Sequence, residues 1–256
     1  MIMSRRAALG GVYLDAQDTS IIIRGIDIGV PHESMSAVNR MGGVGQRVTV
    51  QHWEYLDVNI TFAIDKKKTD LSGRKTVFDK AMKWAMAKGW LTVNYISGRR
   101  IYIDKVILPS AGDLWDWTAD YTITLKAMGI PFWQDTTATT STGSSITVPG
   151  VMQTVCDASI VNSGSSTINS LTVTTGDSSM IFDSLGLAAG ETLEIGHTTD
   201  GLVTIQIKNT NNVYRSAYGK RTTDSSDDLF VEPGSNSISI TGGTVTKTIS
   251  CRGRWT

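Results

Sequence analysis

Hydrophobic residues recur along the chain with two different periods, and the longer period predicts a single helix. Between residues 70 and 89 the apolar positions follow the 3.6-residue spacing of one helix face: Val77, Phe78, Ala81, Met82 and Ala85. Asp70 or Ser72 can accept hydrogen bonds from the first free amides, and Gly89 follows the last predicted turn. The segment therefore carries a start signal, one apolar face and a stop signal.

The shorter period, two residues, predicts strands in the rest of the first half. Residues 54–64 show it most clearly, since an apolar residue stands at every second position from Val58 to Ile64. Other predicted strands cover residues 12–17, 20–30, 48–51, 91–95, 101–107 and 115–127. Because a lone amphipathic helix must bury its apolar face, we expect it to pack on one face of the sheet formed by the strands of 91–95 and 101–107.

Residues 31–47 interrupt this alternation and are predicted to form a long loop that contains glycines. The sequence from Met41 to Arg47 is rich in glycine but matches neither the dinucleotide-binding fingerprint nor a phosphate-binding loop. Its glycines are better explained by mobility or by close approach of another backbone at an interface. Loops of this length in a compact domain tend to be functional or disordered.

The composition changes at residue 134. Nine of the seventeen residues in 134–150 are Ser or Thr, which predicts a linker or an extended crossing strand, and six of the seven tryptophans precede it. We therefore expect an N-terminal domain, 1–133, and a C-terminal domain, 151–256. The latter contains short apolar runs separated by Gly, Pro, Asn and Asp turns, a pattern typical of an antiparallel sandwich of the jelly-roll or galectin-like kind.

Charge and composition narrow the classes of partner. The 24 basic and 24 acidic residues balance, so neither nucleic acid nor an anionic membrane is indicated. No run approaches the ~20 apolar residues of a membrane span, and no apolar segment follows Arg5 and Arg6 as in a secretory signal. We expect Cys156 and Cys251 to be reduced core residues of the second domain, with a bridge between its first and last strands as the alternative.

Candidate catalytic and metal-binding residues are few. His32, His52 and His197 have no Cys, His or acidic neighbour at metal-ligand spacing, so surface or hydrogen-bonded roles are expected. Ser178, in the sequence Gly176-Asp177-Ser178, lacks the strand-to-helix context of an esterase nucleophile, and a turn is predicted instead.

Two further groups of residues suggest ligands only weakly. Asp224, Asp227 and Asp228 do not have the spacing of an EF-hand calcium loop, which favours a solvated loop. Tyr214 and Tyr218, beside Arg215, are the only aromatic platform for a sugar. We predict no catalytic, cofactor or metal site, and no enzymatic activity.

Four segments resemble a known family. Residues 70–95 and 132–135 resemble the N-terminal belt domain of siphophage distal tail proteins. Residues 187–195 and 229–238 resemble the galectin-like C-terminal domain of that family. His197 is a departure, since an acidic residue is expected there. The resemblance implies a mainly β fold: a sandwich or barrel-like belt domain with one α-helix, then an antiparallel galectin-like β-sandwich.

The same resemblance implies a structural role in the virion. Six belt domains would form a homohexameric ring at the tip of a phage tail, after synthesis in the host cytoplasm. Implied partners are the tail-tube protein, the C-terminal end of the tape-measure protein, the baseplate hub or tail-associated protein, and receptor-binding proteins. Our hypothesis for the contact between subunits or rings is Arg40, Met41, Gly42, Gly43, Val44 and Gly45. The alternatives are a tail-tube protein with an appended sandwich domain and a glycan-binding module.

Overall fold

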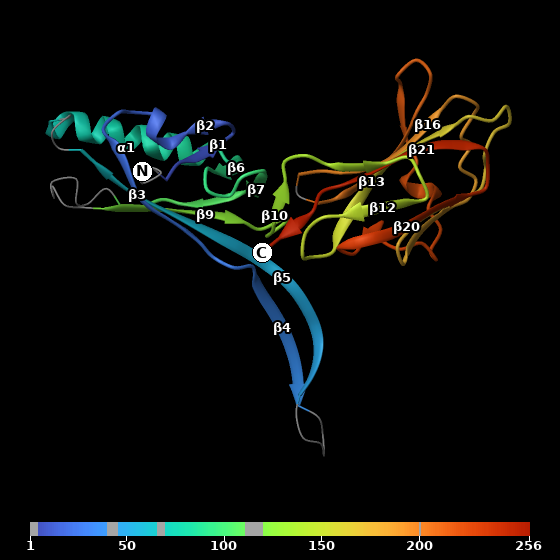
Figure 1. Cartoon of the computed structure of the whole chain (residues 1–256), viewed down its shortest axis with the longest axis horizontal. Helices are drawn as coiled ribbons and strands as arrows, with labels where there is room; N and C mark the ends of the chain where they lie inside the picture. Colours follow the sequence, from blue (N-terminus) through green and yellow to red (C-terminus); the bar gives the residue numbers. More distant parts are fainter. Residues whose placement is uncertain (1–4, 40–45, 66–69, 111–119, 200) are drawn as a thin grey trace. The chain divides into compact units, whose positions relative to one another are not determined.

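The computed structural model describes residues 5–39, 46–65, 70–110, 120–199 and 201–256. The chain divides into two compact units, Met1–Trp133 and Gln134–Thr256 (Figure 1). Strands dominate both, and α1 (Leu71–Met86) is the one α-helix of the described residues. The predicted mainly β fold with a single helix is therefore confirmed. No helix in this part of the chain has the length and apolar composition needed to cross a bilayer.

The first unit contains two antiparallel sheets. One has the order β2-β1-β6-β7, and the other has the order β3-β5-β9-β8, with β4 pairing β5 as well. The elements are β1 (Ala7–Leu9), β2 (Val12–Tyr13), the 3-10 helix η1 (Leu14–Ala16), β3 (Ile21–Ile28), β4 (His32–Asn39), β5 (Gln46–Ile64), β6 (Gly89–Val93), β7 (Arg99–Ile103), β8 (Lys105–Ile107) and β9 (Tyr121–Ala127).

Helix α1 begins and ends at the signals that the sequence predicts. The Asp70 side chain accepts a hydrogen bond from the Gly73 amide at 2.7 Å, which satisfies one of the free amides of the first turn. After Met86 the chain passes through positive φ at Lys88 (52°) and Gly89 (106°), a conformation that ends a helix.

The apolar face of α1 packs on the sheet of β5 and β9. The Phe78 ring meets the edge of Tyr121 on β9 with ring centroids 5.1 Å apart, and Tyr121 in turn contacts Phe62 on β5 at 5.5 Å. Trp84 is buried, and its indole Nε1 donates to the Val12 carbonyl at 2.7 Å. The helix does pack on one face of a sheet, but these rings contact β5 and β9, whereas the predicted strands β6 and β7 belong to the other sheet. The packing buries the large aromatic side chains that stabilise this unit.

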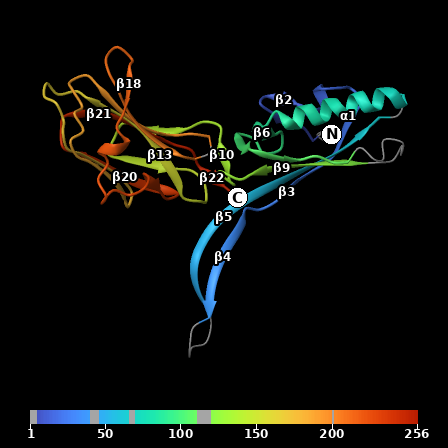
Figure 2. The same ribbon diagram turned by 180° about the vertical axis from the view of Figure 1, so that it is seen from behind.

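The prediction of a loop over residues 31–47 is wrong for residues 32–39 and 46–47, and residues 40–45 lie outside the described residues. β4 and the first part of β5 form a two-stranded antiparallel ribbon, with a register that runs from His32 opposite Tyr55 to Asn39 opposite Gln46. We call this ribbon, residues 32–39 and 46–55, the arm; it extends away from the other strands of its unit (Figures 1 and 2). β4 pairs with no described strand except β5, and the ribbon lies apart from the other strands of its unit. Its sequence therefore need not alternate as a strand packed on a core does.

The second unit is a sandwich of two antiparallel sheets, with orders β11-β21-β13-β16-β17-β18 and β12-β20-β14-β15; β19 also pairs β13. β10 (Trp133–Asp135) spans the division between the units. The others are β11 (Thr139–Ser141), β12 (Ser145–Val148), β13 (Thr154–Asn162), β14 (Leu171–Thr175), β15 (Ser178–Phe182), β16 (Thr192–His197), β17 (Val203–Lys208), β18 (Tyr214–Ser216), the 3-10 helix η2 (Tyr218–Lys220), β19 (Phe230–Val231), β20 (Gly234–Thr241), β21 (Val245–Cys251) and β22 (Arg254–Trp255).

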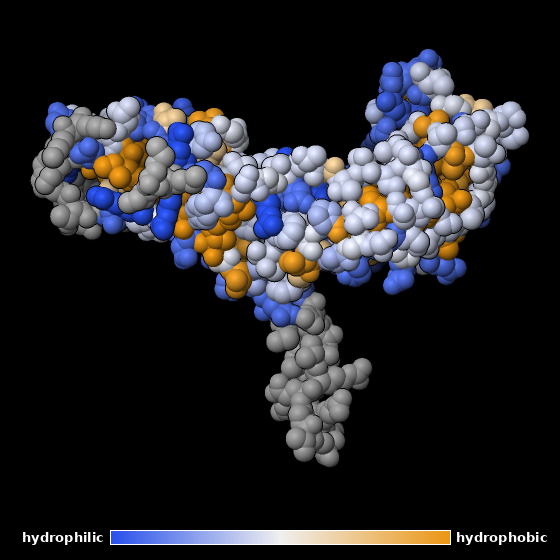
Figure 3. Space-filling model, viewed as in Figure 1, coloured by the Kyte–Doolittle hydropathy of each residue, from blue (hydrophilic) through white to orange (hydrophobic). Residues whose placement is uncertain are grey.

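Alternate residues of these strands form the core of the sandwich. On β13, Cys156, Ala158 and Ile160 are buried, whereas the residues between them face outward. Phe182 and Leu171 contribute fully buried side chains from the other sheet. The outside is rich in Ser and Thr, and the second unit is accordingly mostly pale in Figure 3, with smaller hydrophobic areas. This arrangement is the predicted antiparallel sandwich.

The predicted linker 134–150 is instead part of the second unit. β11 pairs with β21, and β12 pairs with β20 from Ser145 opposite Ser237 to Val148 opposite Gly234. Ile146 and Val148 are buried in the core. Because Thr favours strands and the outward positions are polar, a Ser/Thr-rich segment can supply edge strands while its few apolar residues point inward.

Gly242, in the turn between β20 and β21, provides a test of this packing. Its φ is 113°, and a Cβ at this position would overlap the backbone carbonyl of Ser170. We expect Gly242→Ala to lower the free energy of unfolding by about 3 kcal/mol, measured by urea denaturation. Gly186 also has positive φ (64°) but has no atom near its would-be Cβ. Gly186→Ala should therefore cost only about 1 kcal/mol, and equal losses would contradict the predicted clash.

Candidate functional site

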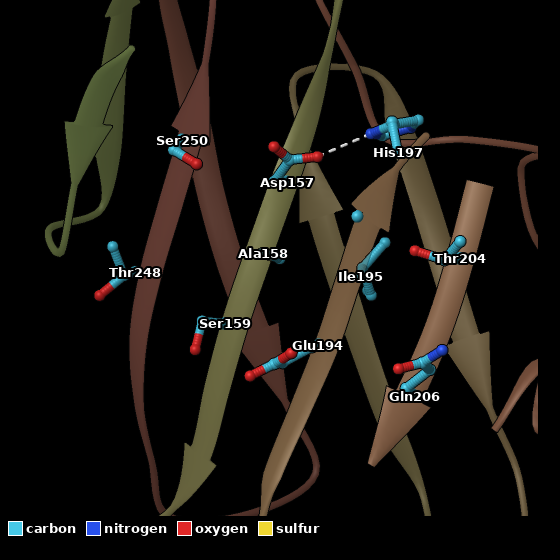
Figure 4. Close-up of a pocket in the computed structure, with 11 residues that line it drawn as sticks. Asp157, Ala158, Ser159, Glu194, Ile195, His197, Thr204, Gln206, Thr248 and Ser250 are labelled. Atoms are coloured by element: carbon cyan, nitrogen blue, oxygen red, sulfur yellow. Dashed lines mark hydrogen bonds and ion pairs between the residues drawn. The ribbon is translucent and has the colours of Figure 1, made fainter. Parts of the chain in front are cut away.

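A polar depression of about 340 Å³ lies on the outer face of the sheet formed by β21, β13, β16 and β17 (Figure 4). It exists because the residues of each strand alternate between the core and the surface. The side chains that line it include Asp157, Ser159, Glu194, His197, Thr204 and Gln206. The surface is therefore rich in hydrogen-bonding groups and has no aromatic residue in its lining.

His197 forms the most closely connected charged cluster in this depression. Its Nδ1 lies 2.7 Å from Oδ1 of Asp157, and its Nε2 lies 2.8 Å from both carboxylate oxygens of Asp228. A carboxylate only accepts hydrogen bonds, so both ring nitrogens must carry a proton. Burial opposes this charge, but the hydrogen bonds and negative charges of the two aspartates outweigh it and raise the pKa of His197 to about 9.

The cluster fastens three segments of the second unit together. His197 ends β16, Asp157 lies on β13, and Asp228 precedes β19 and also accepts the Leu229 amide at 2.7 Å. Since both ring nitrogens are occupied by carboxylates, the imidazole has no free lone pair for a metal or for general-base catalysis. Sequence spacing could not reveal the cluster, because the partners lie 40 and 31 residues away.

Two of the aspartates considered for calcium, Asp227 and Asp228, contact different basic side chains. Asp228 belongs to the His197 cluster, and the exposed Asp227 lies 3.7 Å from the Arg221 guanidinium. Among the residues that the structure describes, no group of three or more His, Cys, Asp or Glu is placed to hold a metal ion. His32, by contrast with His197, stacks on the Tyr55 ring at 4.3 Å, beside the base of the arm.

The hydroxyl of Ser178 forms hydrogen bonds with backbone groups. Gly176 and Asp177 form the turn between β14 and β15, as predicted. The buried Ser178 hydroxyl accepts a hydrogen bond from the Phe230 amide at 2.6 Å and lies 2.9 Å from the Thr175 carbonyl, to which it can donate. These contacts join β15 to β19 and account for the serine without a nucleophilic role.

The residues considered for sugar binding are an arginine held by an ion pair and two exposed rings. Arg215 forms a bidentate ion pair with Glu191, with both N–O distances 2.6 Å, and also donates to the Gly186 carbonyl. The guanidinium holds the pKa of the Glu191 carboxyl below its usual value. Arg215 therefore fixes the edge strand β18, whereas Tyr214 and Tyr218 remain half exposed.

The segment from Arg40 to Gly45, our hypothesis for the subunit interface, lies outside the described residues. What the structure describes is the arm, whose two strands this segment connects in sequence. The base of the arm is held by aromatic contacts. Trp53 packs edge-on against Phe132 at 5.4 Å, and Lys126 lies 3.9 Å from the centre of the Tyr55 ring.

Beyond the arm, the outer face of the β5–β9 pair carries three directly opposed polar pairs: Asp57–Lys126 at 2.9 Å, Asn59–Thr124 at 2.7 Å and Thr61–Thr122 at 3.0 Å. We call these pairs the polar ladder. Since α1 covers the opposite face of the same strands, the polar ladder gives this sheet one apolar and one hydrogen-bonded face.

These features define a two-unit β protein with a helix-covered first unit, a projecting arm and an antiparallel sandwich. No protein-family model matches the sequence, and no curated protein matches it. The same fold occurs in the Dit protein of phage SPP1, described as a paradigm of the hub adsorption apparatus in phages that infect Gram-positive bacteria. The TM-score is 0.60 at 13% identity, over 98% of this chain and 99% of that chain.

Two further solved structures come from the phage P2 baseplate in its activated conformation. The chain from the Ca form has a TM-score of 0.49 at 8% identity, covering 98% of both chains. The chain from the Sr form has the same TM-score and identity, with 97% coverage of both. The structural neighbours are thus phage Dit and baseplate proteins, and the likeness to SPP1 Dit establishes the shared fold over the whole chain.

The His197 cluster predicts a pH-dependent stability. The pKa of His197 is about 6.5 in an unfolded chain and about 9 in the folded one, so its stabilisation is complete below pH 6.5 and is lost as pH rises through 9. Between pH 6.5 and 9.5 we expect the unfolding free energy of the wild type to fall by about 2 kcal/mol more than that of His197→Gln. Urea unfolding at each pH measures this.

The control for that experiment is His52→Gln, because the His52 side chain is 57% exposed. This variant should keep the full pH dependence of the wild type. If the unfolding free energies of the wild type and His197→Gln fall equally as pH rises, the charge on His197 does not stabilise the fold as its contacts indicate.

Proposed function

We propose that this protein is a structural distal tail component of a phage, in which six copies form a ring that joins the tail tube to the baseplate hub. The observation that carries the proposal is the match to SPP1 Dit over 98% of this chain and 99% of that chain. Its partners would be further copies of itself, the tail-tube protein, the end of the tape-measure protein and the hub protein. The sandwich would carry receptor-binding parts.

The arm supports a role in assembly. A cyclic oligomer is built from head-to-tail contacts, in which one surface of each subunit meets a different surface of the next. A two-stranded ribbon that leaves the body of its unit can reach such a neighbour, and the outer edge of β4 pairs with no described strand. We therefore place the intersubunit contact on the arm, together with Arg40 to Gly45, which connect its two strands in sequence.

Two other functions have specific support. A tail-tube protein with an appended sandwich would have a belt-like first unit of the same kind, and the resemblance in residues 70–95 does not separate the two. A glycan-binding module is suggested by the half-exposed rings of Tyr214 and Tyr218. A tail-tube protein would assemble into long tubes instead of closed rings. A glycan-binding module would not need to assemble at all.

Electron microscopy of the purified full chain tests these alternatives, together with mass photometry. We expect closed rings of six subunits, alone or as a pair of rings. Long tubes would indicate a tail-tube protein, and particles that remain monomeric at micromolar concentration would contradict the ring. A glycan-array screen in parallel identifies a binding module if the monomer is retained on defined sugars.

Shortening the arm tests the position of the contact. Replacing residues 37–49 with Asn-Gly leaves Ser36 opposite Val50, their register in the native ribbon, with a turn that hairpins favour. We expect a folded monomer with the circular dichroism spectrum and melting temperature of the wild type. The fraction of subunits in rings should fall at least tenfold.

The matched control shortens a different exposed hairpin. Replacing residues 209–213, between β17 and β18, with Asn-Gly removes a shorter exposed tip from the second unit and leaves Lys208 opposite Tyr214. This variant should form rings as the wild type does. If the arm variant also forms rings at wild-type concentration, the arm is not the subunit contact.

A further inference from the structure

The only two cysteines of the chain face one another. Cys156 lies near the start of β13, Cys251 is the last residue of β21, and the two are directly opposite in the register of these neighbouring strands. They are about 95 residues apart in sequence. Both side chains are buried, with 0% and 3% exposure, within the core of the sandwich.

The strand geometry at this pair is the one that a disulfide can span. The Cys156 amide donates to the Leu229 carbonyl at 2.8 Å, on the side of β13 away from β21. Cys156 and Cys251 therefore form a non-hydrogen-bonded pair, in which opposed Cα atoms lie about 4.5 Å apart and side chains approach most closely. Disulfides bridge Cα separations of roughly 4.4–6.8 Å, so the bond requires no change of register.

The two thiols already interact and have different acidities. A hydrogen bond between them lowers the pKa of the Cys251 thiol, and the same hydrogen bond together with burial raises the pKa of the Cys156 thiol. Cys251 is thus the thiol that ionises first and the better initial nucleophile. It is also next to the edge of its sheet, since only the three-residue strand β11 pairs beyond it, with Thr139 opposite Cys251. Because β11 is so short, it can open locally and let a small oxidant reach Cys251.

We propose that Cys156 and Cys251 form a reversible cross-strand disulfide by exchange with a low-molecular-weight disulfide such as oxidised glutathione. The Cys251 thiolate attacks one glutathione sulfur, breaks its S–S bond and releases one reduced glutathione. The Cys156 thiolate then attacks the Cys251 sulfur and releases the second glutathione. Two protein thiols are oxidised, one small disulfide is reduced, and their two protons pass to the departing thiolates.

The bond would join the β13 and β21 strands and close a loop of about 95 residues, a length for which the loss of unfolded-state entropy is large. In a reducing cytoplasm the pair would stay as thiols, and in an oxidising medium outside the cell the bond would close. The inference does not depend on ring formation, because both residues lie within the second unit.

The test compares the full chain before and after incubation with oxidised glutathione, both in the native state and during refolding from urea. We expect the intact mass to fall by about 2 Da, both thiols to become unreactive together, and one cross-linked peptide to contain Cys156 and Cys251. The melting temperature of the second unit should rise on the order of 10 °C and return to its original value with dithiothreitol.

Cys156→Ala and Cys251→Ala are the matched controls, since each leaves one thiol. Under the same oxidation each should show a glutathione adduct or no change, and neither should gain thermal stability. The proposal is overturned if the wild type keeps both thiols after refolding in oxidised glutathione. It is equally overturned if the wild type forms only glutathione adducts or bonds between chains.

Discussion

The packing of α1 on β5 and β9 is the interaction on which the first unit depends. Phe78, Tyr121 and Phe62 form one connected aromatic group between the helix and the sheet. The first unit has no second described helix that could cover this face, so removing the contact would expose the apolar side of its longest strand. The polar ladder on the opposite side of the same two strands follows from the alternation of side chains along each strand.

The second unit must also bury the apolar side of each sheet, and it does so by placing two sheets face to face. Its apolar residues occupy alternate positions, and its surface positions are filled largely with Ser and Thr, which tolerate both strand geometry and water. Two small groups of charged side chains add contacts between particular strands. The His197 cluster joins the central strands β13 and β16 to the segment before β19, and the Arg215–Glu191 pair fastens the edge strand β18.

Sequence patterns predicted the elements whose faces are buried. The start of α1 at Asp70, the alternation of residues 58–64 and the inward residues of the sandwich all follow from burial, and the structure agrees. The arm was missed because a ribbon without a packed face leaves no periodic signal. The contacts of His197 were missed for another reason, since they depend on the register of strands that are distant in sequence.

The continuous length of β5 has a mechanical consequence. One strand of 19 residues pairs with β4 in its outer part and with β3 and β9 in its inner part, without a break between the two. A hinge needs residues that can absorb a change in backbone angles, and the ladder between β4 and β5 is irregular at only two steps, His32/Glu33 and Ser36/Ala37. A force applied at the outer end of β5 is therefore transmitted along the strand to the sheet beneath α1. It would reach the contacts of Phe78, Tyr121 and Phe62.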